Sequence, residues 1–340
     1  MAIAGNAFDP KEFQFLVAEQ DDWGTLNPDS SGSPDNPYIA LDVDSIGSPT
    51  LGVTQVLDVR SGSRVLQATD FFQDVKGSIK EISVSGTATT AGLDLLLSNL
   101  TGDATVPYAM ASNISTSTLT SATTNQTGQQ LLSIVYKSPA SNKDLAFKDC
   151  FCTNLTLNGD ANTEGGRVKF SATFKTGSLV ADLTNTSITT DTAIAQNNYF
   201  MSDWSNPTYR QIAGVTDSVL SSFSLELIND VQFVGLTSTG FEQATRAGEA
   251  SATASFTVLY DDNFTGLFET FNNQTTGASQ GITTMNPDDS ISDGDFGFKM
   301  ANSIITEVSF NEANLMMLDV SVKALGAGEG SSTALISVGC

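Results

Sequence analysis

Residues 168–175 read VKFSATFK, with an apolar side chain at every second position and a polar one between them. A period of two predicts a β-strand with one buried and one solvated face. The same alternation appears in residues 219–230 (VLSSFSLELIND) and in Val320 and Val322 around Ser321. Helical periodicity is convincing in only two places, so the sequence predicts a mainly β fold.

Two short helices are expected between the strands. The first follows Thr90, and the second follows Asp261 and Asp262, either of which could cap it. Gly102 ends the first apolar stripe and suits a left-handed C-terminal stop. The residues expected to pack the helices on the sheet are Leu93, Leu96, Leu97 and Leu100 in the first helix and Phe264, Leu267, Phe268 and Phe271 in the second.

The two apolar stripes superpose at a constant offset, and the parallel continues downstream. The matching segments, in chain order, are 145–151 (LAFKDCF) with 296–302 (FGFKMAN), Leu155 and Leu157 with Ile305 and Val308, and 170–175 (FSATFK) with 318–323 (LDVSVK). Order and spacing agree, which indicates a divergent internal duplication of a strand, helix and hairpin unit. The alternative is a chance resemblance between β-rich segments of similar composition.

The expected organisation is two tandem β-sandwich or barrel units, each with one short helix packed on its sheet. The expected boundaries are 1–35 for an N-terminal assembly arm, 36–180 for the first unit, 181–205 for a linker, 206–325 for the second unit and 326–340 for a C-terminal tail. The first unit also holds an insert, residues 103–130, which is dense in Ser and Thr. Such an insert is expected to be a surface loop or an extended arm.

The charge balance excludes several functions. The chain has 340 residues, with 15 Lys and Arg against 38 Asp and Glu, a net charge of −23 and no histidine. A protein that grips nucleic-acid phosphates needs clustered cations, so this class is excluded. Without histidine, Ser-His-Asp and Cys-His nucleophiles and His-ligated zinc are absent as well. We therefore expect no enzyme, no catalytic residue and no cofactor.

Two groups of residues could suggest a metal site. The first is an acidic turn around Gly294, made of Asp288, Asp289, Asp293 and Asp295. It lacks the glutamate that an EF-hand loop needs at its twelfth position, so a solvated turn is expected, and cation binding there is left open. The second is formed by the cysteines, expected to be small buried hydrophobes: Cys150, Cys152 and Cys340.

No membrane or export segment is expected. Residues 1–18 contain Asp9, Lys11 and Glu12, where a signal peptide needs an unbroken apolar core. No later run approaches 18 apolar residues. The sequence therefore predicts a protein made in the cytoplasm.

Several segments, taken in order, resemble the tail tube (major tail) proteins of long-tailed bacteriophages. These segments are 15–25 (FLVAEQDDWGT), 38–43, 76–102 with its Leu-rich helix, 147–177 with its long hairpin, and 219–230. The chain departs from the family in its Ser/Thr insert after Gly102 and in the acidic turn near Asp288.

The resemblance implies a structural virion protein of the phage tail. Tail tube proteins stack as rings in which strands of neighbouring subunits close an inner β-barrel, so the expected partner is the chain itself. A family ring holds six copies of the fold, which would allow three subunits of two units each, with six subunits as the alternative. The resemblance also implies tape measure, tail terminator and distal tail proteins as partners. DNA would be a transient, non-adhering cargo, because an acidic lumen repels phosphates.

Contacts between rings are expected from the N-terminal arm and the 103–130 insert, with Phe13, Phe15 and Trp23 as anchors. Two other classes remain open. A capsid or tail decoration module, or an adhesin-like β-sandwich, would behave as a discrete monomer or trimer. A carbohydrate-active enzyme would need a cleft with two opposed carboxylates, and no pair stands out among the 38 acidic residues.

Overall fold

The structure is a computed structural model of a mainly β protein. It describes residues 12–20, 22–27, 38–47, 54–57, 65, 71–74, 78–103, 105–111, 118–120, 130–139, 144–178, 181–183, 198–199, 210–216, 218–237, 240–264, 266–273, 281–285, 296–312, 315–326 and 334–340. The predicted fold class is thereby confirmed, because strands dominate the chain and the described helices are short.

The first part of the chain, as far as β12, is called the first half below. Its elements are β1 (Gln14–Gln20), β2 (Ile39–Ala40), β3 (Val43–Ile46), β4 (Thr54–Leu57), β5 (Phe71–Asp74), β6 (Lys80–Thr87), α1 (Thr90–Thr101), β7 (Tyr108–Ala111), β8 (Thr118–Thr120), β9 (Leu131–Lys137), β10 (Asp144–Asp160), β11 (Lys169–Thr176) and β12 (Ala181–Leu183).

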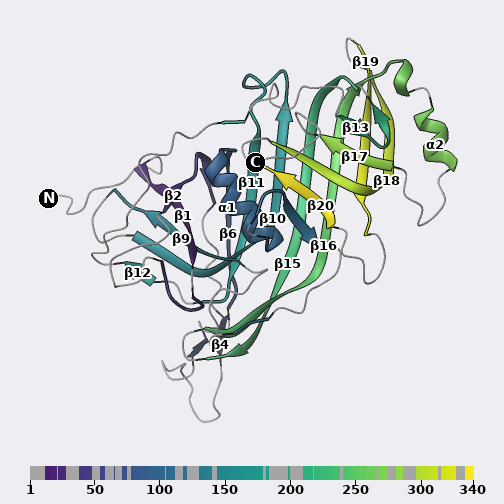
Figure 1. The fold of residues 1–340 in the computed structure, drawn as a ribbon. Helices are drawn as coiled ribbons and strands as arrows, with labels where there is room; N and C mark the ends of the chain where they lie inside the picture. Colours follow the sequence, from purple (N-terminus) through teal and green to yellow (C-terminus); the bar gives the residue numbers. More distant parts are fainter. Residues whose placement is uncertain are drawn as a thin grey trace.

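The rest of the chain is called the second half. Its elements are β13 (Gln211–Ile212), β14 (Val215–Thr216), β15 (Leu220–Leu236), β16 (Phe241–Leu259), a 3₁₀ turn (Asp262–Phe264), α2 (Leu267–Asn273), β17 (Gly281–Met285), β18 (Gly297–Glu312), β19 (Met316–Ala324) and β20 (Ala334–Gly339). Figure 1 shows the two halves side by side, with the long strands β10, β15 and β16 running between them.

The alternation in residues 168–175 has the expected consequence. Val168, Phe170, Ala172 and Phe174 are at most 4% exposed, while the residues between them point to the other face of β11. The pattern gives this result because successive side chains of a strand point to opposite faces.

The two halves have the same topology, element by element. In the first half the strands pair in the order β2-β1-β9-β10-β11-β6-β3, and in the second half in the order β14-β13-β17-β18-β19-β16-β15. In each half the helix follows the corresponding strand, β6 or β16. The last short strand of each half, β12 or β20, pairs with the start of the long strand β10 or β18.

The halves also share two irregularities. One extra residue, Thr153 in β10 and Thr306 in β18, interrupts the pairing with the next strand. Its hydroxyl donates to a carbonyl of that strand in both halves, at 3.3 Å to Thr173 and 3.1 Å to Ser321. A second shared bulge lies at the start of β3 and of β15. Because β-bulges are specific features of a fold, this agreement supports the internal duplication.

The shared bulge also fixes the alignment of the halves. It pairs residues 170–175 with 318–323, as expected from the sequence, and it places Leu155 opposite Val308. The expected match of Leu155 with Ile305 is therefore wrong. In β10 the extra residue Thr153 precedes Leu155, whereas in β18 the extra residue Thr306 lies between Ile305 and Val308. A match of Leu155 with Ile305 therefore places Leu155 on the wrong side of the bulge.

Helix α1 lies where it was expected. It begins after Thr89 and ends at Gly102, whose φ of 76° is left-handed and whose N–H bonds to the Ser98 carbonyl at 2.9 Å. Its stripe of leucines is at most 1% exposed: Leu93, Leu96, Leu97 and Leu100.

The second helical segment is divided. A 3₁₀ turn carries the buried Phe264, and α2 begins only at the buried Leu267, after Gly266. Glycine is a poor helix former, which favours an interruption at this point. Phe268 and Phe271 are partly buried against the same core.

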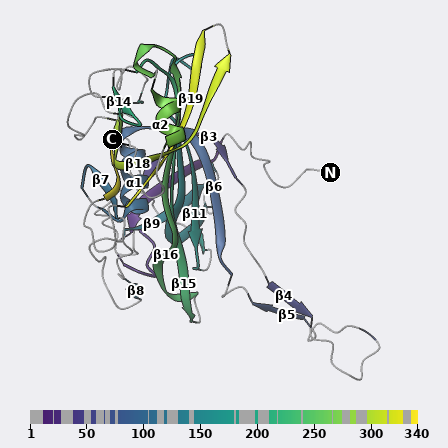
Figure 2. The same cartoon turned by 90° about the vertical axis from the view of Figure 1, so that its right-hand side faces the viewer.

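One hydrophobic core runs through both halves, from the leucines of α1 to Phe264 and the apolar face of β19. β1 lies in the expected N-terminal arm and β20 in the expected C-terminal tail, and both strands belong to the main body. β1 pairs along its whole length with β9, and β20 pairs with β18 and β7. Figure 2 shows the β4–β5 ribbon projecting away from the main body.

Candidate assembly surface

A central sheet connects the halves, because β10 of the first half pairs with β15 of the second. Its strand order is β3-β6-β11-β10-β15-β16-β19-β18. One face of this sheet is apolar and contributes to the core. The other face, called the polar wall, carries mainly Ser, Thr and Asn. One row of paired residues crosses it from β6 to β18: Thr87, Lys169, Asn158, Ser224, Ser255, Ser321 and Glu307.

Two lysines of the polar wall, Lys169 and Lys175, are held in ion pairs. Lys169 contacts Asp44 at 2.9 Å and Glu164 at 2.8 Å, and Lys175 contacts Asp230 at 2.8 Å. Burial would lower the pKa of Lys169, but hydrogen bonds and charge from Glu164 and Asp44 raise it above its ordinary value. These two lysines therefore offer little unbalanced positive charge to a phosphate.

The junction between β10 and β15 is an antiparallel ladder. It runs from Asn154 opposite Ile228 to Asp160 opposite Ser222. On its apolar face Leu157 faces Leu225, and both are 0% exposed. On its polar face the Asn154 amide donates to the Glu226 carboxylate at 3.1 Å. Main-chain pairing and side-chain packing thus join the halves into one sheet.

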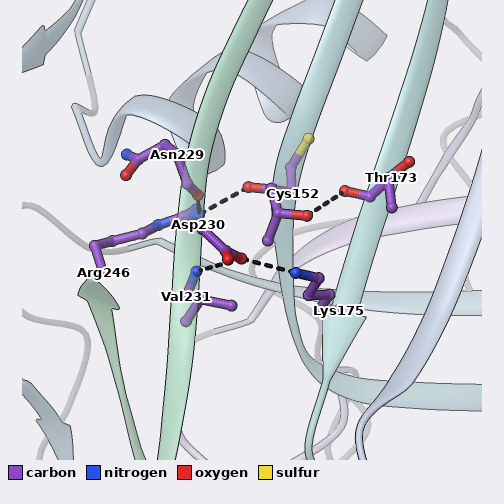
Figure 3. Close-up of polar contacts among 8 residues, drawn as sticks. Cys152, Thr173, Lys175, Asn229, Asp230, Val231 and Arg246 are labelled. Atoms are coloured by element: carbon purple, nitrogen blue, oxygen red, sulfur yellow. Dashed lines mark hydrogen bonds and ion pairs between the residues drawn. The ribbon is translucent and has the colours of Figure 1, made fainter. Parts of the chain in front are cut away.

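Beyond this junction, β15 and β16 continue as a ribbon, and β8 pairs with β16 there from Gln243 to Thr245. Arg246 fastens the base of this ribbon. The guanidinium is buried and donates to the carbonyls of Cys152 at 2.8 Å, Asn229 at 2.5 Å and Asn99 at 2.6 Å. It also lies over the Phe151 ring at 5.2 Å from its centroid. Figure 3 shows Arg246 reaching from the ribbon to Cys152 and Asn229. One side chain thereby connects the ribbon, β10 and α1.

Asp230 lies at an irregularity in the β15–β16 pairing at the same place, where it stands opposite residues 247–249 of β16. Its carboxylate accepts hydrogen bonds from Lys175 and from the Val231 N–H, both at 2.8 Å (Figure 3). Burial alone would raise the pKa of Asp230, but these hydrogen bonds and the charges of Lys175 and Arg246 outweigh it and lower the pKa. Burial lowers the pKa of Arg246 to about 10, so the guanidinium still carries its charge at neutral pH.

The two outermost strands of the central sheet, β3 and β18, each have one edge without a strand partner among the described residues. β3 pairs with β6 alone. β18 pairs with β19 along Ser303–Glu312, and β17 covers its other edge only as far as Ser303. An unpaired edge presents free N–H and C=O groups and is a template for a further strand.

Side-chain exposure identifies the same edge. The shared bulge aligns Leu157 of β10 with Phe310 of β18. Leu157 is 0% exposed beside β15, whereas Phe310 is 51% exposed and packs against Tyr260 and Phe268. Equivalent positions therefore differ in burial because a strand covers one edge and no described strand covers the other.

The expected ring-to-ring anchors lie in different environments. Phe15 is 0% exposed and packs edge-on against Tyr136 at 5.2 Å, so its side chain has no surface left for another ring. Trp23 is partly buried beside Phe151, at 6.4 Å between ring centroids. Phe13 is partly exposed. Contacts of Phe13 and Trp23 with another ring stay predictions.

The turn that carries Trp23 is fastened to its own chain. Asp149 is 0% exposed and accepts hydrogen bonds from the Gln20 amide at 2.6 Å and from the Gly24 N–H at 2.7 Å. A buried carboxylate with several donors holds such a turn firmly.

Burial suppresses the reactivity of two of the cysteines. Burial raises the pKa of the Cys152 thiol to about 12 and that of Cys150 as well, so neither is a reactive thiolate. Within the ranges given above, no group of Cys, Asp or Glu could hold a metal ion. The acidic turn from Asp288 to Asp295 lies outside the described residues. Neither described helix has the length and apolar character needed to cross a bilayer.

Arg246 was not singled out from the sequence. The available signal was its position in β16, where it occupies the same register as the buried Ala244 and Ala252. A lone cation in the apolar register of a strand indicates a buried, bonded side chain. Comparison with known protein families and with curated proteins found no match for this chain.

Proposed function

We propose that this chain is a self-assembling structural protein whose copies pair edge to edge into rings, and that the rings stack into the tail tube of a long-tailed bacteriophage. The observation that carries the proposal is the β10–β15 junction. It joins two topologically equivalent halves, and this junction would be repeated by the edges of β18 and β3 that no described strand covers. A heterologous contact that repeats around an axis closes a ring.

The size of the ring follows from the sheet. With eight central strands per chain, three copies contribute 24 strands and six copies contribute 48. For strands about 4.8 Å apart and tilted by about 40°, the backbone barrel would be about 50 Å across with three copies and about 100 Å with six. Three copies would give pseudo-sixfold symmetry, because each chain supplies two halves.

The polar wall would line this barrel. Its hydroxyl and amide groups and the ion-paired Lys169 and Lys175 suit a conduit along which DNA slides without adhering. By resemblance, the tube would meet tape measure, tail terminator and distal tail proteins in the phage tail. No enzymatic step and no cofactor is part of this proposal.

The alignment of the halves predicts the register between copies. Counted from the two shared bulges, Gly159 of β10 is equivalent to Glu312 of β18. In the same way, Phe223 of β15 is equivalent to Ile46 of β3. Gly159 faces Phe223 inside the chain, so Glu312 of one copy should face Ile46 of the next. Directly opposed residues of antiparallel strands are close enough for an engineered disulfide.

Electron microscopy of the purified protein tests the assembly, with hollow tubes expected and the barrel diameter separating three from six copies. A double variant, Glu312→Cys with Ile46→Cys, tests the register. Under oxidation it should give a ladder of covalent oligomers on a non-reducing gel. The described native cysteines are buried and should not interfere.

The matched control pairs Glu312→Cys with Ser85→Cys on β6, one strand further from the edge. This control should give no ladder. A protein that stays monomeric at high concentration, or tubes in which the Glu312 and Ile46 variant fails to cross-link, would count against the proposed ring.

A further inference from the structure

The β4–β5 ribbon has the same strand register as the β15–β16 ribbon. In each half the ladder resumes eight residues along one strand and ten along the other, counted from the pair Ile46–Val84 or the pair Phe223–Phe256. The β4–β5 ribbon is therefore the counterpart, in the first half, of the β15–β16 ribbon. The corresponding pairs are Thr54–Asp74 and Val231–Arg246, Gln55–Gln73 and Gln232–Thr245, Val56–Phe72 and Phe233–Ala244, and Leu57–Phe71 and Val234–Gln243.

The β15–β16 ribbon packs on the half of the molecule to which it does not belong. Phe151 of β10 is 0% exposed and shares an apolar cluster with Val231 and Ala244 of the ribbon. The Phe233 ring stands edge-on to the Phe151 ring, at 5.9 Å between centroids. Gly177, just after β11, lies so close to the ribbon that a side chain there would collide with Phe233. The first half, whose β10 pairs with β15, therefore also receives the ribbon that continues β15.

The β4–β5 ribbon is placed differently. Among the described residues its two strands pair only with each other, and Figure 2 shows them projecting from the main body. Asp74 occupies the register position of Arg246. An ionised carboxylate cannot donate to main-chain carbonyls as the Arg246 guanidinium does, so the contact that fastens the β15–β16 ribbon is not available to its counterpart.

The surface that corresponds to the ribbon site of the first half lies on β18 and just after β19. The shared bulge aligns Phe151 with Ile304 and Gly177 with Leu325. Phe151 is 0% exposed under its ribbon, whereas Ile304 and Leu325 are both partly exposed. The second half thus keeps an apolar surface at this position, and that surface is less covered than its equivalent.

We propose that the β4–β5 ribbon of one copy packs on Ile304 and Leu325 of the neighbouring copy whose β18 pairs with its β3. Within the chain, a ribbon packs on the half with which its own strand pairs, and for β3 that half belongs to another copy. The residue types suit the exchange. Phe233 over Gly177 inside the chain becomes Val56 over Leu325 between copies, so a large side chain on a small one is replaced by a smaller one on a larger one.

The ribbon cannot reach the same surface of its own chain. β3 and β18 are the outermost of eight strands, and seven spacings of about 4.8 Å place them about 34 Å apart. The chain from Gly47 to Thr54 spans at most about 24 Å when fully extended. Figure 1 likewise shows β4 far from β18. The contact rests on the proposed edge pairing, but it uses a surface of its own beside that edge.

Crosslinking tests the contact directly. Val56→Cys with Ile304→Cys, treated with a short thiol-reactive crosslinker, should give a ladder of covalent oligomers on a reducing gel. The matched control is Gln55→Cys with Ile304→Cys, because successive residues of a strand point to opposite faces. The control should give at least tenfold less oligomer. The described native cysteines are buried and should not react.

A second pair of variants tests what the contact contributes to assembly. Phe72→Asp should raise the protein concentration needed for rings at least tenfold, as sedimentation and electron microscopy measure. Gln73→Asp adds the same charge on the other face of the ribbon and should change that concentration less than twofold. Both variants should keep the melting temperature of the isolated chain, since the contact lies between copies. A melting temperature lowered by Phe72→Asp alone would assign this face of the ribbon to its own chain and overturn the proposal.

The two cysteine pairs separate the ribbon contact from the ring itself. A ladder from the Glu312 and Ile46 variant without one from the Val56 and Ile304 variant would overturn the ribbon contact and leave the proposed ring in place. A ladder from the Val56 and Ile304 variant alone would support the ribbon contact and overturn the proposed edge register. A chain that stays monomeric and gives neither ladder would overturn both.

Discussion

The two halves of the molecule share one topology but differ in what lies beside their long strand. In the first half, β15 pairs with β10, and Leu157 is 0% exposed. In the second half, the equivalent edge of β18 has no described partner, and Phe310 is 51% exposed. One edge of the duplicated fold is therefore paired within the chain, at β10, and the equivalent edge of β18 has no described strand beside it. This difference is the basis for expecting a neighbouring chain.

A second difference concerns the hairpin that precedes each helix. In the second half, β15 and β16 run unbroken for 17 and 19 residues into a projecting ribbon. In the first half, β3 ends after four residues, and β4 and β5 form a separate ribbon. Arg246 fastens the ribbon of the second half, which makes that ribbon part of the main sheet.

The largest effect is expected at the completed junction. Leu157→Ala should lower the free energy of unfolding by about 2 to 5 kcal/mol, because it opens a cavity in the core. Phe310→Ala should lower it by only about 1 kcal/mol in the isolated chain, since Phe310 is half-exposed. Urea unfolding at low protein concentration measures both values. Equal losses would contradict the distinction between a covered and an open edge.

Arg246→Met should destabilise the chain by about 2 to 3 kcal/mol, because buried carbonyls of Cys152, Asn99 and Asn229 lose a charged donor. Lys323→Met, on the exposed face of β19, removes the same charge and should stay within about 0.5 kcal/mol of the wild type. Thermal unfolding compares the two variants. A similar loss in both would show that net charge, and not the carbonyl contacts, sets the effect.

The two bulge threonines make a matched pair of smaller size. Thr153→Val removes a hydrogen bond to Thr173 at a 4% exposed site and should cost about 1 kcal/mol. Thr306→Val removes the equivalent bond at an exposed site, where water replaces it, and should cost less than about 0.5 kcal/mol. Chemical denaturation distinguishes them. If both variants lost the same stability, burial would not be what separates the halves.

The smallest effect is the pH dependence of the Asp230 contacts. Its pKa is lowered in the folded chain, so its contribution is present above the unfolded value of about 4 and is lost as the pH falls through the folded pKa. Asp230→Asn should therefore be less stable than the wild type at pH 6, and the difference should shrink towards pH 3. Melting temperatures across this range measure it, and a constant difference would contradict the assigned cause.

Much of the fold could be predicted from the sequence because its signals are local. The alternation in residues 168–175 and the leucines that precede Gly102 each specify an element and its buried face. The candidate surface was less predictable. Nothing in the alternation around Leu157 specifies that its edge meets Leu225, and the partners of Arg246 are main-chain carbonyls that carry no sequence signal.

The sequence by itself determined the strands, the first helix and the repetition of one unit, because side-chain periods of 2 and 3.6 are written into neighbouring residues. The tertiary structure alone decided which edges are covered, since strand pairing joins segments far apart in the chain through main-chain groups that every residue possesses. Leu157 and Phe310 occupy equivalent positions in equivalent strands, and only the presence of β15 beside one of them makes it part of the core.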